Sequence, residues 1–394
     1  MARGFLRIGI DGRAIYKKID GIGRYSLNLI RSLASIDHTN QYVIFKNQEV
    51  TERLAPVENF REVAVRFRHL SLGSVAYLPL LMKGLDLDVF HAPFFICPAW
   101  GINNVIITVH DLMALTFPGF FGGRSNIQEK AAKLYHRMFV PLSIRKAKKI
   151  IAVSETTKEA LIDHLHVRSE KISVIYEGVD ACFKKAYTEK ALEAFRVRKG
   201  LPHKYLLYVG NMKPYKNVGL IVSALAVLKK KGRLKHKLVM AGRKDRFFPV
   251  VYRNVQKNEL SDDVIFLDYV GDDELPLLFK NAGTFLFPSA SEGFGLPPLE
   301  AMSLGVPTIV SNTSSLPEVV GDGGVLVDPK DPGGLAAAIW KVSEDLAFRR
   351  RLADKGIKRS RAFSWETTAR ETLKLYSEMG AKRQVRNNPP LPYR

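Results

Sequence analysis

The sequence has few of the residues that would build a cross-linked or membrane-spanning protein. Only two cysteines, Cys97 and Cys182, occur in 394 residues, which excludes a disulfide framework and favours a reducing compartment. The stretch 89–110 has no charged side chain except its histidines, but prolines, a glycine and asparagines interrupt it. It is therefore interpreted as buried strand and loop rather than a bilayer span. The apolar run in the first ten residues is too short for an export signal.

Acidic residues are also scarce, with 39 Asp and Glu against 60 Lys and Arg, so the formal net charge is +21. Nucleic acid, anionic lipid and phosphorylated small molecules are all compatible with that charge. The segment 124–149 concentrates it, with eight basic residues, one acidic residue and an apolar set interrupted by Pro141. This predicts a helix pair with a basic face that rests on an anionic membrane; the alternative is a solvated face whose apolar side packs internally.

Short apolar runs separated by longer amphipathic stretches predict parallel sheets joined by crossover helices. The expected strands of the first half are 6–10, 42–45, 63–67, 88–91, 105–109 and 150–153. Those of the second half are 205–209, 238–241, 264–267, 284–287, 308–310 and 325–327. The repetition predicts two doubly wound α/β domains, 1–180 and 181–364. Residues 381–394, rich in proline and basic side chains, are expected to form a flexible tail.

Two segments of the second half could carry chemistry. Lys213–Asn217 follows a predicted strand through Gly210 and precedes a helix over 218–228. A lysine at such a helix start is typical of a phosphate site. A surface lysine at an ordinary turn would give the same sequence pattern. The segment 288–302 places Glu292 in a loop and Glu300 about one turn into the next helix. The two carboxylates could contact different parts of one elongated ligand. Alternatively, Glu300 only complements the helix dipole and Glu292 is only a solvated loop residue, or the two are the acid and the nucleophile of a glycoside hydrolase.

The first half offers weaker signals. Gly21–Tyr25 contains a GxG sequence, which lets the backbone approach a ligand, but the full dinucleotide-binding motif GxGxxG is absent. Asp11-Gly12-Arg13 is equally well explained as residues that favour a turn. His110 ends a predicted strand, where open sheets place ligands, although a histidine satisfied by backbone would sit there too. Asp86-Leu87-Asp88 resembles a metal-binding DxD, but it enters a strand rather than leaving one, so no metal site is expected.

Together these segments resemble the family 4 glycosyltransferases of the GT-B fold over nearly the whole chain. The block from Glu292 to Glu300, with Gly-Phe-Gly after the first glutamate and Glu-Ala-Met at the second, looks like that family's most specific signature. Further near-matches are 21–25, 110–112, 153–155, 177–180 and 210–217, and 363–366 looks like the start of the final helix. The resemblance implies two Rossmann-like domains facing a central cleft. The first would be the acceptor side, with a helix of about 365–380 packing back on it, and the second would bind a nucleotide sugar.

The resemblance also implies roles for single residues. His110 would face the transferred sugar and Glu292 would orient it; these two are the catalytic candidates. Lys216 would neutralise the diphosphate, and Glu300 would bind the ribose hydroxyls. The other donor-binding residues it implies are Gly23, Gly210, Asn211, Lys213, Arg243, Tyr269, Val270, Phe294, Gly295 and Leu296.

One position departs from the family's pattern. The family usually has an arginine shortly before the lysine of the Gly210 loop, and this chain has Asn211 there. A second positive charge on the leaving diphosphate is therefore expected from Lys213 or Arg243. No metal ligand is expected.

The activity that the resemblance implies is retaining transfer of a hexose from a nucleoside-diphosphate sugar, without a metal cofactor. Mannose, with GDP-mannose as donor, is favoured because the segments 110–112 and 21–25 resemble members that make O-antigen or capsule chains. The acceptor would be a glycan or a lipid-linked glycan in lipopolysaccharide or other cell-surface polysaccharide synthesis, in the cytoplasm or on the inner face of the membrane. The alternatives are a nucleotide-sugar 2-epimerase of the same fold and a basic nucleic-acid-binding protein, although no aromatic and basic binding motif supports the latter.

Overall fold

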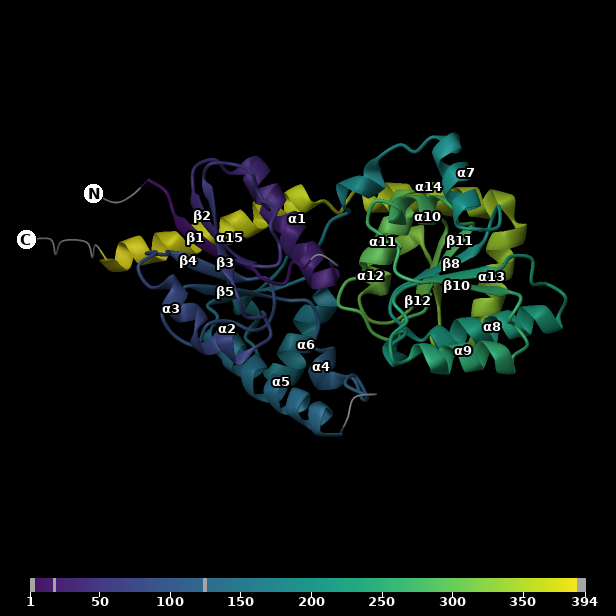
Figure 1. Cartoon of the computed structure of the whole chain (residues 1–394), viewed down its shortest axis with the longest axis horizontal. Coiled ribbons are helices and arrows are strands. Elements are labelled where there is room, and N and C mark those ends of the chain that lie inside the picture. Colours follow the sequence, from purple (N-terminus) through teal and green to yellow (C-terminus); the bar gives the residue numbers. More distant parts are fainter. Residues whose placement is uncertain (1–3, 17–18, 123–125, 388–394) are drawn as a thin grey trace, which may run out of the picture. The chain divides into compact units, whose positions relative to one another are not determined.

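The structure, a computed structural model, describes residues 4–16, 19–122 and 126–387. The chain forms two compact units (Figure 1). Unit 1 contains the chain up to Leu115, then Lys130–Gly178 and the segment that begins at Ser364; unit 2 contains Thr116–Glu129 and Val179–Phe363. The boundary predicted between 180 and 181 lies close to the point where the chain leaves unit 1.

Unit 1 is built on a seven-stranded parallel sheet in the order β3-β2-β1-β4-β5-β6-β7. Its strands are β1 Arg7–Gly12, β2 Gln41–Asn47, β3 Phe60–Val65, β4 Val89–Ala92, β5 Val105–Val109, β6 Lys149–Ala152 and β7 Ile172–Val174. Its helices are α1 Gly21–Ile36, α2 Leu72–Ala76, α3 Leu78–Met82, α4 Met113–Thr116, α5 Asn126–Lys146, α6 Glu155–Leu165 and α15 Trp365–Asn387, with both α4 and α5 reaching across the unit boundary.

Unit 2 is built on a six-stranded parallel sheet in the order β10-β9-β8-β11-β12-β13. Its strands are β8 Leu206–Val209, β9 Leu238–Ala241, β10 Val264–Leu267, β11 Thr284–Phe287, β12 Thr308–Ser311 and β13 Val325–Val327. Its helices are α7 Glu189–Arg198, α8 Val218–Lys230, α9 Phe248–Lys257, α10 Leu275–Asn281, α11 Leu296–Ser303, α12 Leu316–Val320, α13 Pro332–Glu344 and α14 Leu346–Ser360. The two doubly wound parallel sheets confirm the predicted fold class.

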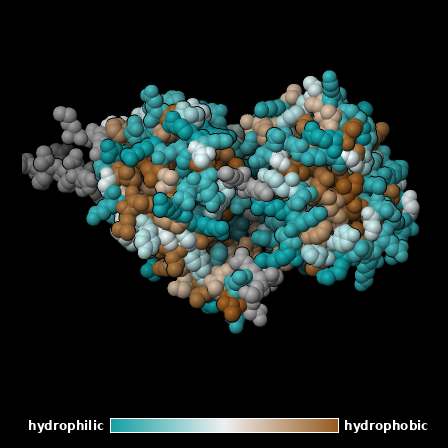
Figure 2. Space-filling view, viewed as in Figure 1, coloured by the Kyte–Doolittle hydropathy of each residue, from teal (hydrophilic) through white to brown (hydrophobic). Residues whose placement is uncertain are grey.

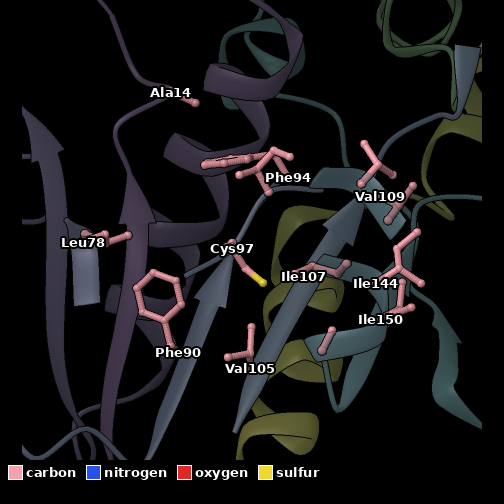
Figure 3. Packing of buried hydrophobic residues seen from close by; sticks show 14 of the residues in the cluster. Ala14, Leu78, Phe90, Phe94, Cys97, Val105, Ile107, Val109, Ile144 and Ile150 are labelled. Atoms are coloured by element: carbon pink, nitrogen blue, oxygen red, sulfur yellow. The ribbon is translucent and has the colours of Figure 1, made fainter. Parts of the chain in front are cut away.

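The core of unit 1 consists of apolar side chains from the central strands. Figure 3 shows Cys97 among Phe90, Val105 and Ile107, all of them buried. Burial raises the pKa of the Cys97 thiol to about 11, so this cysteine behaves as a small apolar side chain. Both cysteines are free, as the sequence predicts.

The last helix packs on unit 1 although it follows unit 2 in the chain. In Figure 1 it is the yellow helix α15, which contacts α1 and β4. The Tyr376 hydroxyl lies 2.7 Å from His91 Nδ1, and Thr368 Oγ1 donates to the Tyr176 carbonyl at 2.7 Å. The helix continues to Asn387, past the predicted start of the tail at 381, and residues 388–394 lie outside the described part of the chain.

Two local expectations were wrong. The segment around Pro141 is one helix, α5, rather than a helix pair. Pro141 lies on the exposed side of this helix, where water can satisfy the carbonyl that loses its amide partner, while Val140 and Ile144 pack inward. Strand β3 lies over Phe60–Val65 rather than 63–67, and β7 had no predicted counterpart because its three residues are too few to show a pattern.

Candidate active site

The strand order of unit 2 reverses between β8 and β11, and open α/β sheets bind ligands in the crevice at such a point. Lys216 follows β8 and Glu292 follows β11. The Lys216 Nζ lies 2.7 Å from Glu292 Oε1 and 3.0 Å from Oε2. The two side chains are only 12% and 10% exposed. The structure therefore brings together two residues that the sequence predicts in one site from separate motifs.

The Lys216 loop is fixed to the strand ends by Asn217. Residues Pro214–Lys216 form one 3-10 turn, and Asn217 then adopts a left-handed conformation with φ 56° before α8 begins at Val218. The Asn217 amide donates to the carbonyls of Pro288, at 3.2 Å, and Pro329, at 2.7 Å. Asparagine tolerates this left-handed conformation. Its two hydrogen bonds hold the neighbouring Lys216 near the end of β8.

The Glu292 loop is held by serines that the sequence alone did not single out. The Glu292 amide donates to Ser314 Oγ at 2.9 Å, and Ser315 Oγ donates to the Glu292 carbonyl at 3.0 Å. Gly295 has φ 121°, and a Cβ there would lie 2.9 Å from Leu316 Cδ2, so only glycine fits before α11. Glu300 lies within α11 and is 3% exposed. These serines follow β12, too far along the chain for any local pattern to link them to Glu292.

Both candidates for a second positive charge lie at the same edge of the sheet as Lys216. The Arg243 guanidinium, after β9, lies 5.3 Å from the centre of the Tyr269 ring, after β10. The Lys213 ammonium lies 4.8 Å from the centre of the Phe120 ring, and the Lys213 amide donates to Asn211 Oδ1 at 3.2 Å. An aromatic face therefore lies against each of the two cations.

The predicted site residues divide between the two units. Those in unit 2 are Gly210, Asn211, Lys213, Lys216, Arg243, Tyr269, Val270, Glu292, Phe294, Gly295, Leu296 and Glu300. His110 and Gly23 belong to unit 1. The Gly23 amide donates to the capping carboxylate of Asp20 at 2.9 Å, and a Cβ at Gly23 would lie 2.8 Å from the Ala14 carbonyl, so this glycine lets the turn close against the end of β1.

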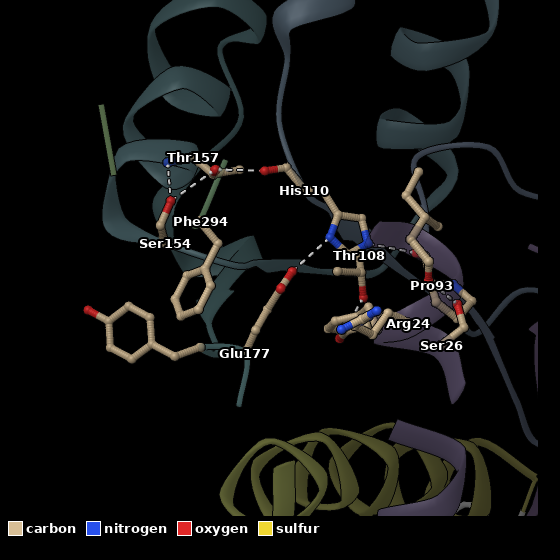
Figure 4. Close-up of polar contacts among 12 residues, drawn as sticks. Arg24, Ser26, Pro93, Thr108, His110, Ser154, Thr157, Glu177 and Phe294 are labelled. Carbon is tan, nitrogen blue, oxygen red and sulfur yellow. Dashed lines mark hydrogen bonds and ion pairs between the residues drawn. The ribbon is translucent and has the colours of Figure 1, made fainter. Parts of the chain in front are cut away.

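His110, at the end of β5, has acceptors on both ring nitrogens (Figure 4). Nδ1 lies 3.0 Å from a Glu177 carboxylate oxygen, and Nε2 lies 3.0 Å from the Pro93 carbonyl oxygen. A carbonyl and a carboxylate only accept, so this arrangement favours a ring that donates from both nitrogens and carries a positive charge. The Tyr25 ring packs edge-on against it at 4.7 Å, and Thr157 Oγ1 donates to the His110 carbonyl at 3.2 Å.

The electrostatics agree with that protonation state. Burial lowers the pKa of His110, but the hydrogen bond and charge of Glu177 outweigh it, so the pKa is raised above its usual value. Glu177 is 3% exposed and was not predicted as a site residue. It lies in the recognised segment 177–180, but its partner is 67 residues away, so no spacing rule connects them.

Replacing Glu177 by glutamine is expected to lower the pKa of His110, because burial is then opposed only by the Pro93 carbonyl and the charge of Asp111. In the wild type the raised pKa means that this pair stabilises the fold at low pH, and that the contribution is lost as pH rises through the folded-state pKa. Titration of the imidazole NMR signals measures the shift. Glu159→Gln, an exposed change on α6, should leave the His110 titration unaltered; an unaltered pKa in Glu177→Gln would contradict the assignment.

The described part of the chain has neither a cluster of metal ligands nor a helix that could span a membrane. Within residues 4–16, 19–122 and 126–387, no group of three or more histidine, cysteine, aspartate or glutamate side chains is arranged to hold a metal ion. Over the same ranges, no helix combines the length and apolar character needed to cross a bilayer.

Comparison with known protein families gives two matches that follow one another along the chain. The family described as Glycosyltransferase Family 4 matches residues 19–182, and the one described as Glycosyl transferases group 1 matches residues 190–359. The first match lies before α7, and the second contains the Lys216 and Glu292 loops.

Among curated proteins, the O-antigen chain mannosyltransferase B of Escherichia coli is 28% identical over 91% of this chain and 96% of its own length. The O-antigen chain mannosyltransferase RfbU of Salmonella typhimurium is 32% identical, with 62% of each chain covered.

Among solved structures, a sucrose-phosphate synthase from Thermosynechococcus elongatus has a TM-score of 0.74 at 19% identity, covering 96% of this chain and all of that one. WaaG, a glycosyltransferase involved in lipopolysaccharide biosynthesis, has a TM-score of 0.70 at 15% identity, covering 94% and 99%. At such identities the likeness concerns the fold alone.

Proposed function

The chain belongs to the family 4, group 1 glycosyltransferases, and from that premise we propose that it transfers a mannosyl residue from GDP-mannose to a growing cell-surface glycan. As a member of this family it is a glycosyltransferase that uses a nucleotide-sugar donor. The choice of mannose is supported by the relatives named above, which are O-antigen mannosyltransferases. The acceptor we propose is a glycan or a lipid-linked glycan, and the anomeric configuration is retained.

The observation that carries the mechanism is the ion pair between Lys216 and Glu292 at the strand crossover. Breaking the glycosidic bond develops negative charge on the leaving diphosphate, and a preorganised cation stabilises that charge most when water is excluded. We assign this role to Lys216, helped by Lys213 or Arg243. When the diphosphate replaces Glu292 as the partner of Lys216, the Glu292 carboxylate becomes available to accept hydrogen bonds from the sugar hydroxyls.

The remaining roles follow the same assignment. Glu300, buried in α11, binds the ribose hydroxyls, and Tyr269 and Val270 flank the base. His110 faces the transferred sugar, and its raised pKa favours the charged ring. Because acceptors face both ring nitrogens, neither nitrogen is open to take up a proton from the acceptor while these contacts last.

A panel of GDP-, UDP-, ADP- and dTDP-sugars, assayed for nucleotide release with and without EDTA, tests the proposal. GDP-mannose should be turned over fastest, and EDTA should not change the rate. Turnover with another donor would overturn the choice of mannose, and no turnover with any donor would overturn the transferase assignment. Product analysis with and without a lipid-linked glycan acceptor distinguishes transfer from 2-epimerisation, which no observation favours.

We further propose that unit 1 binds an anionic membrane surface through α5, where a lipid-linked acceptor would lie. The outward side of this helix carries Leu134, Met138 and Leu142 at four-residue intervals, and each of them is about half exposed. Basic residues such as Arg137 and Arg145 share this exposed side. An apolar stripe flanked by cations is the pattern of a helix that lies in a bilayer interface.

A second apolar patch lies in the same unit. Leu72, Tyr77 and Leu80 of the short helices α2 and α3 are more than half exposed, and Figure 2 shows hydrophobic side chains gathered over these helices at the lower left. The Tyr135 hydroxyl of α5 donates to the Ser71 carbonyl at 3.4 Å, so α5 packs beside this patch. Large exposed apolar patches usually mark an interaction surface.

Replacing Arg145, Lys146 and Lys148 by glutamine is expected to weaken binding to vesicles that contain phosphatidylglycerol by about 100-fold, at roughly 1 kcal/mol for each charge near the surface. Cosedimentation measures it. The matched control replaces Lys355, Lys358 and Arg361 by glutamine, which removes equal charge from unit 2. Equal loss in both variants would show that net charge, rather than this surface, governs binding.

A further inference from the structure

Unit 2 contains a cavity of about 340 Å³ on the side of its sheet opposite the Lys216 and Glu292 loops. It is lined by Lys204, Gly283 and Pro307, which precede β8, β11 and β12, and by side chains of α7 and α14. In a parallel sheet the amino and carboxyl ends of the strands lie at opposite edges. The cavity and the proposed donor site are therefore separate, and its volume is that of a small-molecule site.

Basic side chains dominate the lining of this cavity. The charged residues are Arg196, Lys204, Lys280, Arg349 and Arg350 against Glu189 and Glu193. Two of these cations already have partners, because Arg196 forms an ion pair with Glu193 and Lys280 Nζ donates to the Leu304 carbonyl at 2.7 Å.

The other three cations of the lining form no ion pair. Throughout the described ranges, no carboxylate lies within ion-pair distance of Lys204, Arg349 or Arg350. Burial lowers the pKa of Lys204 and the nearby Arg349 lowers it further, while the charge of Glu189 acts in the opposite direction. Burial and then Arg349 also lower the pKa of His236, which precedes β9. Glu189 offsets only part of the charge of the three cations, so the lining keeps a net positive potential.

Backbone contacts place Lys204 beside Gly283. Lys204 directly precedes the buried Tyr205, whose carbonyl accepts from the Gly283 amide at 2.8 Å. A Cβ at Gly283 would lie 3.8 Å from the Cβ of Lys204, so the absence of a side chain there leaves room beside the lysine stem. Arg349 and Arg350 approach from α14.

We propose that this cavity binds a phosphorylated small molecule, whose phosphate group pairs with Lys204, Arg349 and Arg350. Charge-assisted hydrogen bonds from arginine and lysine are the strongest contacts that a protein offers to phosphate. This site is additional to the proposed transferase function, and a ligand can occupy it together with a bound donor because the two lie at opposite edges of the sheet.

Titration of the full chain with pyrophosphate, followed through the imidazole NMR signal of His203, tests the proposal. His203 lines the cavity and precedes β8, whereas the donor loop follows β8 at the opposite edge of the sheet, so its signal is local to the site. Pyrophosphate should shift this signal in the wild type and equally in Lys216→Ala. The double variant Lys204→Gln with Arg349→Gln should bind at least about tenfold more weakly, and because it removes repelling like charges it should fold normally.

The matched control is Arg351→Gln, an exposed change on α14 outside the cavity. Binding that is equally weakened in Arg351→Gln, or unchanged in the double variant, would overturn the proposal. A second arm uses vesicles containing phosphatidic acid: a His203 shift with vesicles but not with pyrophosphate would assign the site to a lipid headgroup instead. Failure of the donor panel would leave these NMR results intact, so the two proposals can fail separately.

Discussion

Replacing Lys216 by alanine is expected to lower turnover by about 10²- to 10³-fold, the usual loss when one preorganised group that stabilises transition-state charge is removed. Lys216 is the proposed cation nearest the leaving diphosphate, and Asn211 supplies no charge of its own. The loss should appear mainly in kcat, because charge on the diphosphate grows as the glycosidic bond breaks.

The same substitution leaves the Glu292 carboxylate in a largely buried place without its partner, so lost turnover has a second explanation in lost stability. The double variant Lys216→Ala with Glu292→Gln, compared with Glu292→Gln alone, separates the two. It should recover the unfolding midpoint of the wild type and yet turn over more slowly than Glu292→Gln alone. Lys231→Ala, an exposed change after α8, is the control for charge. Turnover in the double variant equal to that of Glu292→Gln alone would contradict the role given to Lys216.

Replacing Gly178 by alanine is expected to destabilise unit 1 by about 3 kcal/mol, at the upper end of the cost of overpacking. A Cβ at this position would lie 2.2 Å from the Trp365 amide nitrogen and 2.5 Å from the Ser364 carbonyl carbon. Both are backbone atoms at the start of α15, so no side-chain rotation can relieve the clash. Either α15 shifts, or the segment that carries the neighbouring Glu177 moves away from His110.

Urea unfolding followed by tryptophan fluorescence measures this effect, since Trp365 lies at the contact. Gly21→Ala is the matched control, because a Cβ there meets nothing within 4 Å and alanine is well tolerated in the first turn of a helix. Gly178→Ala with wild-type stability would show that the start of α15 is not packed as described.

The elements that the sequence predicted well are those whose pattern is local. A short, mainly apolar and β-branched run such as Val105–Val109 is typical of a strand that is buried on both faces of a parallel sheet. The segment from Glu292 to Glu300 could be placed because its glycines and prolines allow only a loop followed by a helix start. Gly210 and Pro214 likewise predict a turn between a strand and a helix, and this turn contains Lys216.

What the sequence could not predict depends on contacts between distant segments. The chain between His110 and Glu177 runs through α4, α5, β6, α6 and β7, and only the completed sheet brings the two within hydrogen-bonding distance. Ser314 holds Glu292 from the loop after β12 in the same way. The course of α5 through Pro141 was missed because proline propensity is a local rule, and here the packing of Val140 and Ile144 outweighs it.

The return of α15 to unit 1 gives the two units different folding histories during synthesis. Apart from Thr116–Glu129, unit 2 is one uninterrupted run of chain that ends at Phe363, so all of it is present once that residue has been made. Unit 1 begins to emerge first, yet His91 cannot meet Tyr376, nor Tyr25 meet Trp365, until the final helix leaves the ribosome. The unit that is synthesised first is the one that is completed last.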